Sequence, residues 1–374
     1  MKTIVIFTTY AFSLTNFRGK LIQELVKRSH IVHTIAPDYD LETRERLSEL
    51  GATCHDCHFE RAGTNIVSDL KAALHLYSLL KQINPDCMLS YFIKPVIYGT
   101  VCGFFSGVGH RVAMIEGLGS VFSDNDSKIS VSKWLRRALV SKMYKIALIF
   151  TNETVFLNQD DVDFFDSRSI LKASKATLLG GIGIDLKEWV NKAPVQSPVT
   201  FIMAARLLRE KGVVDFANAA RQVKASCPEA RFILLGGLDP NPTSLTFDEV
   251  NSWVCEGIIE WPGHVPVMEW LSVSSVFVLP SYYREGIPRS SQEALAMGLP
   301  IITTDSVGCR ETVTNGVNGY MIPIKNVDIL VEKMLIFVNN PELIFEMGKR
   351  SRDLAEFKFS EDKKITIQLD ILNC

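Results

Sequence analysis

Two carboxylates, Glu285 and Glu293, lie eight positions apart where a strand is expected to give way to a helix. The apolar run 276–279 predicts a buried strand, and Pro288 before the good helix formers 292–297 predicts a helix start. The free N–H groups at that start, around Ser290, and the helix dipole would bind an anion. Carboxylates are better suited to accept hydrogen bonds from the hydroxyls of a ribose or a hexose. The segment therefore predicts a nucleotide-sugar site.

A second motif, the basic segment Ala205-Arg-Leu-Leu-Arg-Glu-Lys-Gly212, follows the first predicted strand of the second half, 200–205. A departing diphosphate carries negative charge that must be neutralised; Arg206 can bind it bidentately and Lys211 adds a point charge. On its own the segment is also compatible with a solvated basic turn. Beside the glutamate motif it is better interpreted as a diphosphate site. Leu234-Leu-Gly-Gly237 follows another strand, and Gly236 there would either let the backbone approach a flat base or simply form a tight turn.

The composition bounds the remaining possibilities. The chain has 374 residues, which suits two domains, and its 47% hydrophobic and 22% charged residues are typical of globular proteins. A net charge of −2 argues against a nucleic-acid partner. The start of the chain is better interpreted as a first strand than as a signal peptide, and no apolar run approaches the roughly 18 residues of a membrane span. We therefore expect a cytoplasmic protein, with its eight cysteines as reduced thiols.

The elements that must position these residues alternate between strand and helix. In the first half, helices are expected at 20–28, 67–82 and 132–147, and the strands are expected at 3–8, 31–36, 52–57, 87–90, 111–115, 149–151 and 176–179. After a glycine-rich linker at 180–183, a second series begins, with strands at 200–205, 231–235, 276–279, 301–303 and 320–322. This alternation predicts an α/β protein with two parallel, Rossmann-like sheets, whose ligands bind at the carboxyl ends of the strands.

Segment 281–323 resembles the E-x7-E signature of the family 4 retaining glycosyltransferases, and Arg206 and Lys211 match that family's R-x4-K pair. The resemblance covers most of the chain and implies the GT-B fold: two domains facing across a cleft, with a last helix that crosses back. It implies an acceptor domain at 1–183, a donor domain at 184–358 and the returning helix at 359–374. It also assigns donor contacts to the loop and helix start at Gly286, Ile287, Pro288 and Ser290, and nucleobase contacts to Gly263 and Val265.

The first half offers candidate acceptor residues. Asn16 and Arg18 follow the first strand, where many family members have a glycine-rich loop, and Arg18 is a candidate for the acceptor's diphosphate; an ordinary helix start is the alternative. Glu116 ends a strand in EGLGS, which resembles bacterial polyprenyl-diphosphate-linked sugar transferases, notably the α-1,3-N-acetylgalactosaminyltransferases. The histidine that many family members carry near the reacting carbon falls on about Ile93 here, which shifts attention to Lys94 and Glu116.

Segment 128–149 is basic and contains no acidic residue. Apolar side chains alternate with its cations, which is typical of a helix resting on an anionic membrane surface; Lys133, Trp134, Arg136 and Arg137 are the expected contacts. The alternative is a domain helix with one buried and one solvated face. Two DxD sequences, Asp124–Asp126 and Asp161–Asp163, are better interpreted as structural than as metal ligands, so we expect no metal and no other cofactor.

With these residues, the resemblance implies a metal-independent retaining transferase that moves a hexose, N-acetylgalactosamine above other sugars, from a UDP-sugar to a sugar on undecaprenyl diphosphate in O-antigen assembly at the cytoplasmic face of the inner membrane. A transferase of another UDP- or GDP-hexose and a GT-B nucleotide-sugar 2-epimerase are the alternatives. A nicotinamide-dependent dehydrogenase is disfavoured because no GxGxxG follows the first strand. A non-catalytic, lectin-like sugar-binding protein is a further alternative, but it would not need Arg206 and Lys211.

Overall fold

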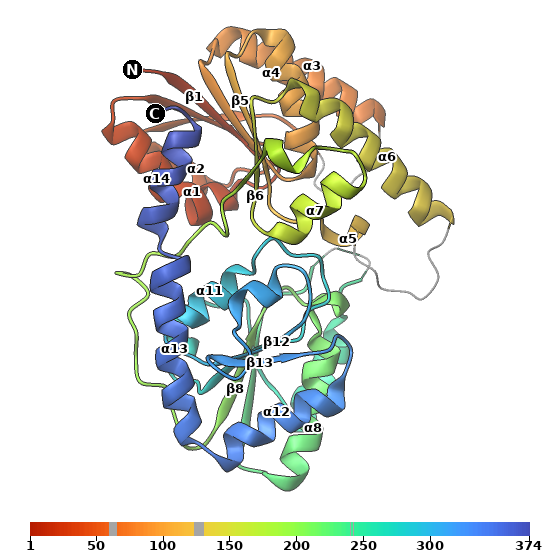
Figure 1. The fold of residues 1–374 in the computed structure, drawn as a ribbon, viewed down its shortest axis with the longest axis vertical. Coiled ribbons are helices and arrows are strands. Elements are labelled where there is room, and N and C mark those ends of the chain that lie inside the picture. Colours follow the sequence, from red (N-terminus) through yellow and green to blue (C-terminus); the bar gives the residue numbers. More distant parts are fainter. Residues whose placement is uncertain (60–65, 123–130, 240, 242) are drawn as a thin grey trace. The chain divides into compact units, whose positions relative to one another are not determined.

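The structure, a computed structural model, describes residues 1–59, 66–122, 131–239, 241 and 243–374. These residues form two compact units (Figure 1). The N-terminal unit contains the described residues of Met1–Val121 and Ile129–Ile182 together with Lys363–Cys374. The C-terminal unit is built from Gly183–Asp362.

The N-terminal unit is organised around a parallel sheet with strand order β3-β2-β1-β4-β5-β6-β7. Its central strands are buried on both faces, which explains why they appear in the sequence as near-continuous apolar runs. Its strands are β1 (Thr3–Phe7), β2 (Ile31–Ala36), β3 (Ala52–Asp56), β4 (Cys87–Tyr91), β5 (His110–Ile115), β6 (Glu153–Phe156) and β7 (Ala176–Leu178).

Helices connect these strands as parallel crossovers require. They are α1 (Phe12–Lys27), α2 (Leu41–Glu49), α3 (Ile66–Ile83), the π-helical turn η1 (Pro95–Gly99), α4 (Thr100–Ser106), α5 (Gly119–Phe122), α6 (Val131–Ala147), the 3₁₀ turn η2 (Leu148–Phe150), α7 (Gln159–Ser167) and the 3₁₀ turn η3 (Ala173–Lys175). None of the helices in the described ranges is both long and apolar enough to span a lipid bilayer.

The C-terminal unit has its own parallel sheet, with order β10-β9-β8-β11-β12-β13. The strands are β8 (Thr200–Ala204), β9 (Arg231–Leu235), β10 (Glu260–Gly263), β11 (Val276–Leu279), β12 (Ile301–Thr304) and β13 (Gly319–Ile322). The helices are η4 (Arg209–Lys211), α8 (Val213–Ser226), α9 (Phe247–Cys255), α10 (Val267–Leu271), α11 (Arg289–Ala296), η5 (Cys309–Thr312), α12 (Val327–Asn339) and α13 (Glu342–Lys358). Two Rossmann-like sheets confirm the predicted fold class.

The last helix, α14 (Glu361–Ile371), returns the chain to the N-terminal unit, where Figure 1 shows it in blue beside the red first elements. Lys2 Nζ donates to the carbonyl of Asn373 at 2.5 Å, and His110 Nε2 lies 2.7 Å from the carbonyl oxygen of Ile371. The predicted return of the C-terminal helix is therefore confirmed.

One strand prediction was wrong, and one strand was missed. The run at 149–151 is not a strand: α6 continues directly into η2 up to Phe150, and the strand β6 begins only at Glu153. An apolar run of three residues cannot distinguish a helix end from a strand. Strand β10 was not predicted, because it is a short edge strand that contains Pro262.

Candidate active site

In the C-terminal unit, the predicted donor residues lie at the point where the strand order reverses. Strands β8 and β11 are neighbours, and the chain continues from β8 to β9 on one side and from β11 to β12 on the other. The loops that leave the carboxyl ends of β8 and β11 carry the two motifs, 205–211 and 281–288. A crevice at such a reversal is where doubly wound sheets bind ligands.

The structure brings the two motifs into direct contact. Lys211 Nζ forms an ion pair with Glu285 Oε1, and each side chain is only 12% exposed. Ser281 Oγ lies 3.4 Å from the same carboxylate oxygen, and Lys211 Nζ is 5.1 Å from the centre of the Tyr283 ring. The backbone fixes this arrangement, because the N–H groups of residues 282 and 283 donate to the carbonyl of Glu210 at 2.9 and 3.0 Å.

Two glycines permit this close approach. Gly212 has φ of 79°, and a Cβ there would lie 2.2 Å from the carbonyl oxygen of Pro280. Gly308 has φ of 78°, and a Cβ there would lie 2.3 Å from the carbonyl oxygen of Gly286. Any larger residue would push the Lys211 turn or the Glu285 loop away. Sequence analysis did not single out either glycine, although Gly212 directly follows the predicted lysine.

Arg206 has a carboxylate partner that the sequence did not reveal. Its guanidinium NH1 lies 3.2 Å from Asp239 Oδ2, and its side chain is 39% exposed against 15% for Asp239. The arginine thus keeps an accessible edge while one side is held. Asp239 follows the glycine pair after β9, so a carboxylate just beyond a strand's carboxyl end was the available signal.

Helix α11 begins one residue later than predicted, because Pro288 lies at the N-cap with ψ of 123° and Arg289 is the first helical residue. Glu293 Oε1 accepts a hydrogen bond from Arg289 Nε at 3.0 Å, one turn apart on the helix. Burial raises the pKa of the Glu293 carboxyl, and the Arg289 guanidinium opposes that shift. Ser290, on the first turn of the helix, is half-buried.

Gln292 is a buried residue of the same helix that sequence analysis missed. Its amide donates to the carbonyl of Ile287 at 3.2 Å, and its side-chain oxygen accepts from the N–H of Gly183 at 3.3 Å. It therefore ties the loop before the helix to the start of the C-terminal unit.

The predicted nucleobase segment surrounds the end of β9. The N–H of Gly236 donates to the carbonyl of Gly263 at 2.9 Å, and Trp261 Nε1 donates to the carbonyl of Gly236 at 2.9 Å. A Cβ on Gly236 would lie 1.9 Å from the carbonyl oxygen of Ala205, so only glycine fits there. Val265 lies just beyond β10 and is half-buried.

In the N-terminal unit, the structure joins two residues that were predicted separately. Arg18 NH2 forms an ion pair with Glu116 Oε1, with side-chain exposures of 0% and 8%. The guanidinium carbon lies 4.7 Å from the centre of the Tyr91 ring, a contact that sequence analysis missed. Burial raises the pKa of Glu116 and Arg18 opposes it. The acceptor role of Arg18 stays a prediction, and a ligand would have to reach a guanidinium that is buried here.

The other two predicted acceptor residues have local partners. Asn16 Nδ2 donates to the carbonyl of Phe12 at 2.9 Å within α1. Lys94 Nζ lies 2.6 Å from Asp69 Oδ1, and Tyr98 donates to the other oxygen of that carboxylate at 3.3 Å. Neither side chain is hydrogen-bonded to Arg18 or Glu116 in the part of the chain that the structure describes.

Helix α6 exposes both cations and apolar side chains. Trp134 is 60% exposed, and Arg136 is exposed as well. Arg137, by contrast, is half-buried and donates Nε to the carbonyl of Val121 at 2.7 Å, and Lys133 is half-buried. The buried residues of α6 are Tyr144 and Ala147, both near its end, so its apolar residues do not form one long buried face.

The DxD sequences divide between the described and undescribed parts of the chain. Asp124 and Asp126 lie outside the described residues. Asp161 is buried in α7 and its N–H is capped by Asn158, while Asp163 accepts from Gln159 at 2.8 Å. Within the described ranges, no group of three or more His, Cys, Asp or Glu residues is arranged to hold a metal ion.

Comparison with known proteins identifies the family of this chain. The family model described as Glycosyl transferases group 1 matches residues 198–340. The chain is 30% identical over 371 residues to the N,N'-diacetylbacillosaminyl-diphospho-undecaprenol alpha-1,3-N-acetylgalactosaminyltransferase of Campylobacter jejuni, covering 95% of this chain and 94% of that protein. It is 24% identical to the UDP-Gal:alpha-D-GlcNAc-diphosphoundecaprenol alpha-1,3-galactosyltransferase of Escherichia coli, covering 80% of this chain and 78% of that protein.

A solved structure with the same fold is the sucrose-phosphate synthase of Thermosynechococcus elongatus, with a TM-score of 0.84 at 15% identity, covering 99% of this chain and 98% of that one. The two Rossmann-like units have the topology of the GT-B fold. The chain belongs to the family Glycosyl transferases group 1, and it is a glycosyltransferase.

Proposed function

We propose that this glycosyltransferase moves N-acetylgalactosamine from UDP to a sugar on undecaprenyl diphosphate, with retention of the anomeric configuration, in the assembly of a surface polysaccharide such as O-antigen. The proposal is supported by the full-length similarity to a relative whose name specifies transfer to a diphospho-undecaprenol-linked sugar. A UDP donor is supported by the name of the second relative.

The observation that carries the proposal is the Lys211–Glu285 pair with Arg206 beside it at the strand-order reversal of the C-terminal unit. In the proposed reaction, Arg206 and Lys211 would stabilise the departing diphosphate, which carries the largest charge that develops. Both cations now hold carboxylates, and the donor's phosphates would take over part of those contacts. The N–H groups at the start of α11 would add to the anion site.

The two glutamates would act on hydroxyl groups. Glu285, in the loop before α11, would accept hydrogen bonds from the transferred sugar, and Glu293, inside the helix, from the ribose. Gly236, Gly263 and Val265 would line the uracil. We propose front-side substitution, in which the leaving phosphate assists deprotonation of the acceptor hydroxyl, because no nucleophile was identified in the motif.

The acceptor would bind to the N-terminal unit, with Asn16, Arg18 and Lys94 as its contacts and Glu116 close to the reacting groups. We further propose that the protein works at the cytoplasmic face of the inner membrane, with α6 resting on the anionic leaflet. The exposed Trp134 and Arg136 support this placement, because a helix that exposes both apolar and cationic side chains suits the lipid interface. The reaction is proposed to need no metal ion, since fixed cations can neutralise the diphosphate.

The test is a screen of UDP-N-acetylgalactosamine, other UDP-hexoses and GDP-hexoses with a short polyprenyl-diphosphate-linked sugar as acceptor. We expect a new glycosidic bond with α configuration in the nuclear magnetic resonance spectrum of the product. Interconversion of UDP-sugars without any acceptor would instead identify a 2-epimerase. A β-linked product would refute retention.

A further inference from the structure

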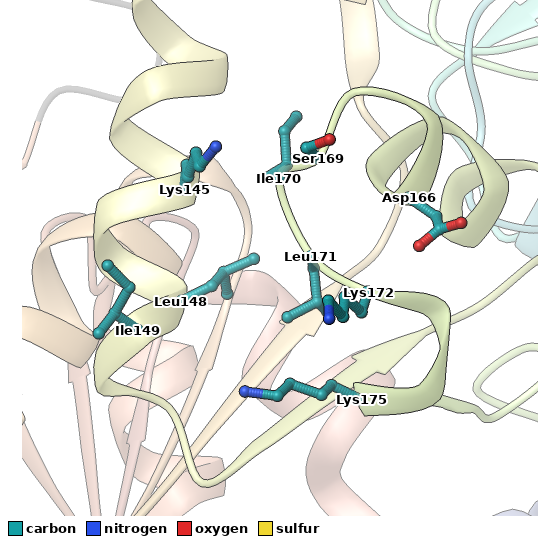
Figure 2. Close-up of a pocket in the computed structure, with 9 residues that line it drawn as sticks. All are labelled: Lys145, Leu148, Ile149, Asp166, Ser169, Ile170, Leu171, Lys172 and Lys175. Carbon is teal, nitrogen blue, oxygen red and sulfur yellow. The ribbon is translucent and has the colours of Figure 1, made fainter.

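The N-terminal unit contains an open pocket that the proposed reaction does not use. It lies between the end of α6, the turn η2 and the connection from α7 to β7, and its volume is about 440 Å³ (Figure 2). Its apolar floor comes from Leu148 and Leu171, which Figure 2 shows pointing toward each other, while the side chain of Ile149, also a lining residue, lies on the outer side of η2. All of its lining residues belong to the N-terminal unit, whereas the two predicted donor motifs belong to the C-terminal unit.

Three lysines line this pocket from two different elements. Lys145 comes from α6, whereas Lys172 and Lys175 come from the α7–β7 connection, where Figure 2 shows the Lys175 side chain extending toward α6. Among the residues that the structure describes, none of the three forms an ion pair. The carboxylate in the lining, Asp166, accepts a hydrogen bond from the N–H of Ala173 at 2.9 Å. The pocket therefore carries an excess of positive charge.

The apolar floor continues onto an exposed apolar surface. Ile149 lines the pocket and is 73% exposed. The next residue, Phe150, packs against Phe104 and Phe105 of α4, with ring centres 4.7 and 5.9 Å away, and Phe105 is itself 63% exposed. Lysines around an apolar floor that opens onto exposed aromatic and aliphatic side chains match a molecule with a charged head and an apolar tail.

We propose that this pocket binds an anionic phospholipid, with its headgroup among Lys145, Lys172 and Lys175, its first methylene groups on Leu148 and Leu171, and its apolar chain running out over Ile149. The inference rests on the proposed membrane contact of α6 and extends it. General attraction to a charged membrane surface needs no pocket. A pocket, by contrast, can select one lipid headgroup. A phosphate group suits these lysines as point charges. Free phosphate offers the same charge but no apolar part, so the two ligands can be separated.

The test is calorimetric titration of the full-length protein with dihexanoyl phosphatidylglycerol below its micelle concentration, with dihexanoyl phosphatidylcholine and inorganic phosphate as parallel ligands. We expect saturable binding of one phosphatidylglycerol and much weaker binding of the other two. Lys172→Gln with Lys175→Gln should weaken it about tenfold or more. Ile149→Ser should also weaken it, since this exposed side chain can change without loss of the fold. The matched control is Lys27→Gln with Arg46→Gln, two exposed cations on α1 and α2.

Equal binding of phosphate and phosphatidylglycerol would overturn the lipid assignment, as would affinity unchanged in the Lys172/Lys175 variant or the absence of binding. Because the titration uses a monomeric lipid and no membrane, its outcome is independent of α6 docking. Turnover with a water-soluble acceptor should be unchanged in the Lys172/Lys175 variant, which separates this site from the proposed transferase reaction.

Discussion

In the C-terminal unit, each predicted diphosphate-binding cation forms an ion pair with a carboxylate. Lys211 and Glu285 are mostly buried together, and Arg206 is held by Asp239. Removing one partner of such a pair leaves the other charge poorly solvated, so a substitution there has a cost beyond the lost contact. Comparisons between variants therefore need controls in which an equally exposed ion pair is broken elsewhere.

Arg206→Ala or Lys211→Ala should each lower turnover by roughly 100-fold or more, because each removes a charge-assisted contact that matters most as the diphosphate leaves. The measurement is kcat with saturating donor. Arg231→Ala is the control for Arg206: the two arginine side chains are similarly exposed, at 41% and 39%, and each is paired with a carboxylate, but Arg231 lies at the amino end of β9, the opposite edge of the sheet. Turnover of either site variant equal to that of the control would remove these residues from the reaction.

Substitutions of the two glutamates should have different kinetic effects. Glu285→Gln keeps the shape of the side chain but weakens acceptance of a sugar hydroxyl, so it should mainly lower kcat. Glu293→Gln should mainly weaken UDP binding, by about 1–3 kcal/mol for hydrogen bonds to a charged group. Both kcat and UDP affinity by calorimetry are measured for each variant. If the two effects are exchanged, the assignment of the carboxylates is reversed.

Glu293 should also make stability depend on pH. Its pKa is raised by burial in the folded protein, so the unfolded chain loses this proton first, near the ordinary value of about 4.3. The free energy of unfolding should therefore fall, relative to Glu293→Gln, as pH rises from that value through the raised pKa. Urea unfolding of both proteins at several pH values tests this. Parallel pH profiles would show that the carboxyl is not perturbed.

At the scale of elements, helix α6 exposes apolar and cationic side chains together, and packing within the N-terminal unit does not explain this pattern. Arg136 and Lys142 are exposed, whereas Arg137 is engaged with the carbonyl of Val121. The structure therefore changes which cations are best suited to a test: reversing Arg137 would disturb a structural contact as well as a charge.

Arg136→Glu with Lys142→Glu should release the protein from anionic vesicles, with a loss of about 2 kcal/mol at about 1 kcal/mol for each basic residue removed. Co-sedimentation with vesicles rich in phosphatidylglycerol measures the change. Lys27→Glu with Arg46→Glu, on α1 and α2, controls for net charge. Equal release of both variants would mean that net charge, and not α6, determines binding.

At the scale of the whole molecule, the reaction needs a donor, an acceptor and a way to neutralise the departing diphosphate. Turnover should persist in excess EDTA, because Arg206 and Lys211 would supply the positive charge that a divalent ion provides in other transferases. The assay compares wild-type turnover with and without EDTA, and then after addition of Mn²⁺. Loss of activity that Mn²⁺ restores would direct attention to Asp124 and Asp126.

The sequence by itself determined the class of the protein and the positions of the two motifs that are proposed to bind the donor. Buried parallel strands are continuous apolar runs, and Pro288 before good helix formers marks a helix start, so these features are local and can be read in order. The Ile149–Thr151 error shows the limit of such local patterns, because a three-residue run fits either a helix end or a strand.

Only the tertiary structure decided which charges are partners. Glu285 is 74 positions from Lys211, and Glu116 is 98 positions from Arg18, yet each is paired. Such pairs depend on which loops the strand order brings to one edge of a sheet and on how deeply each side chain is buried. Neither quantity is encoded in the local spacing of residues, so Asp239, Tyr91 and the lysine pocket became visible only when the sheets were assembled.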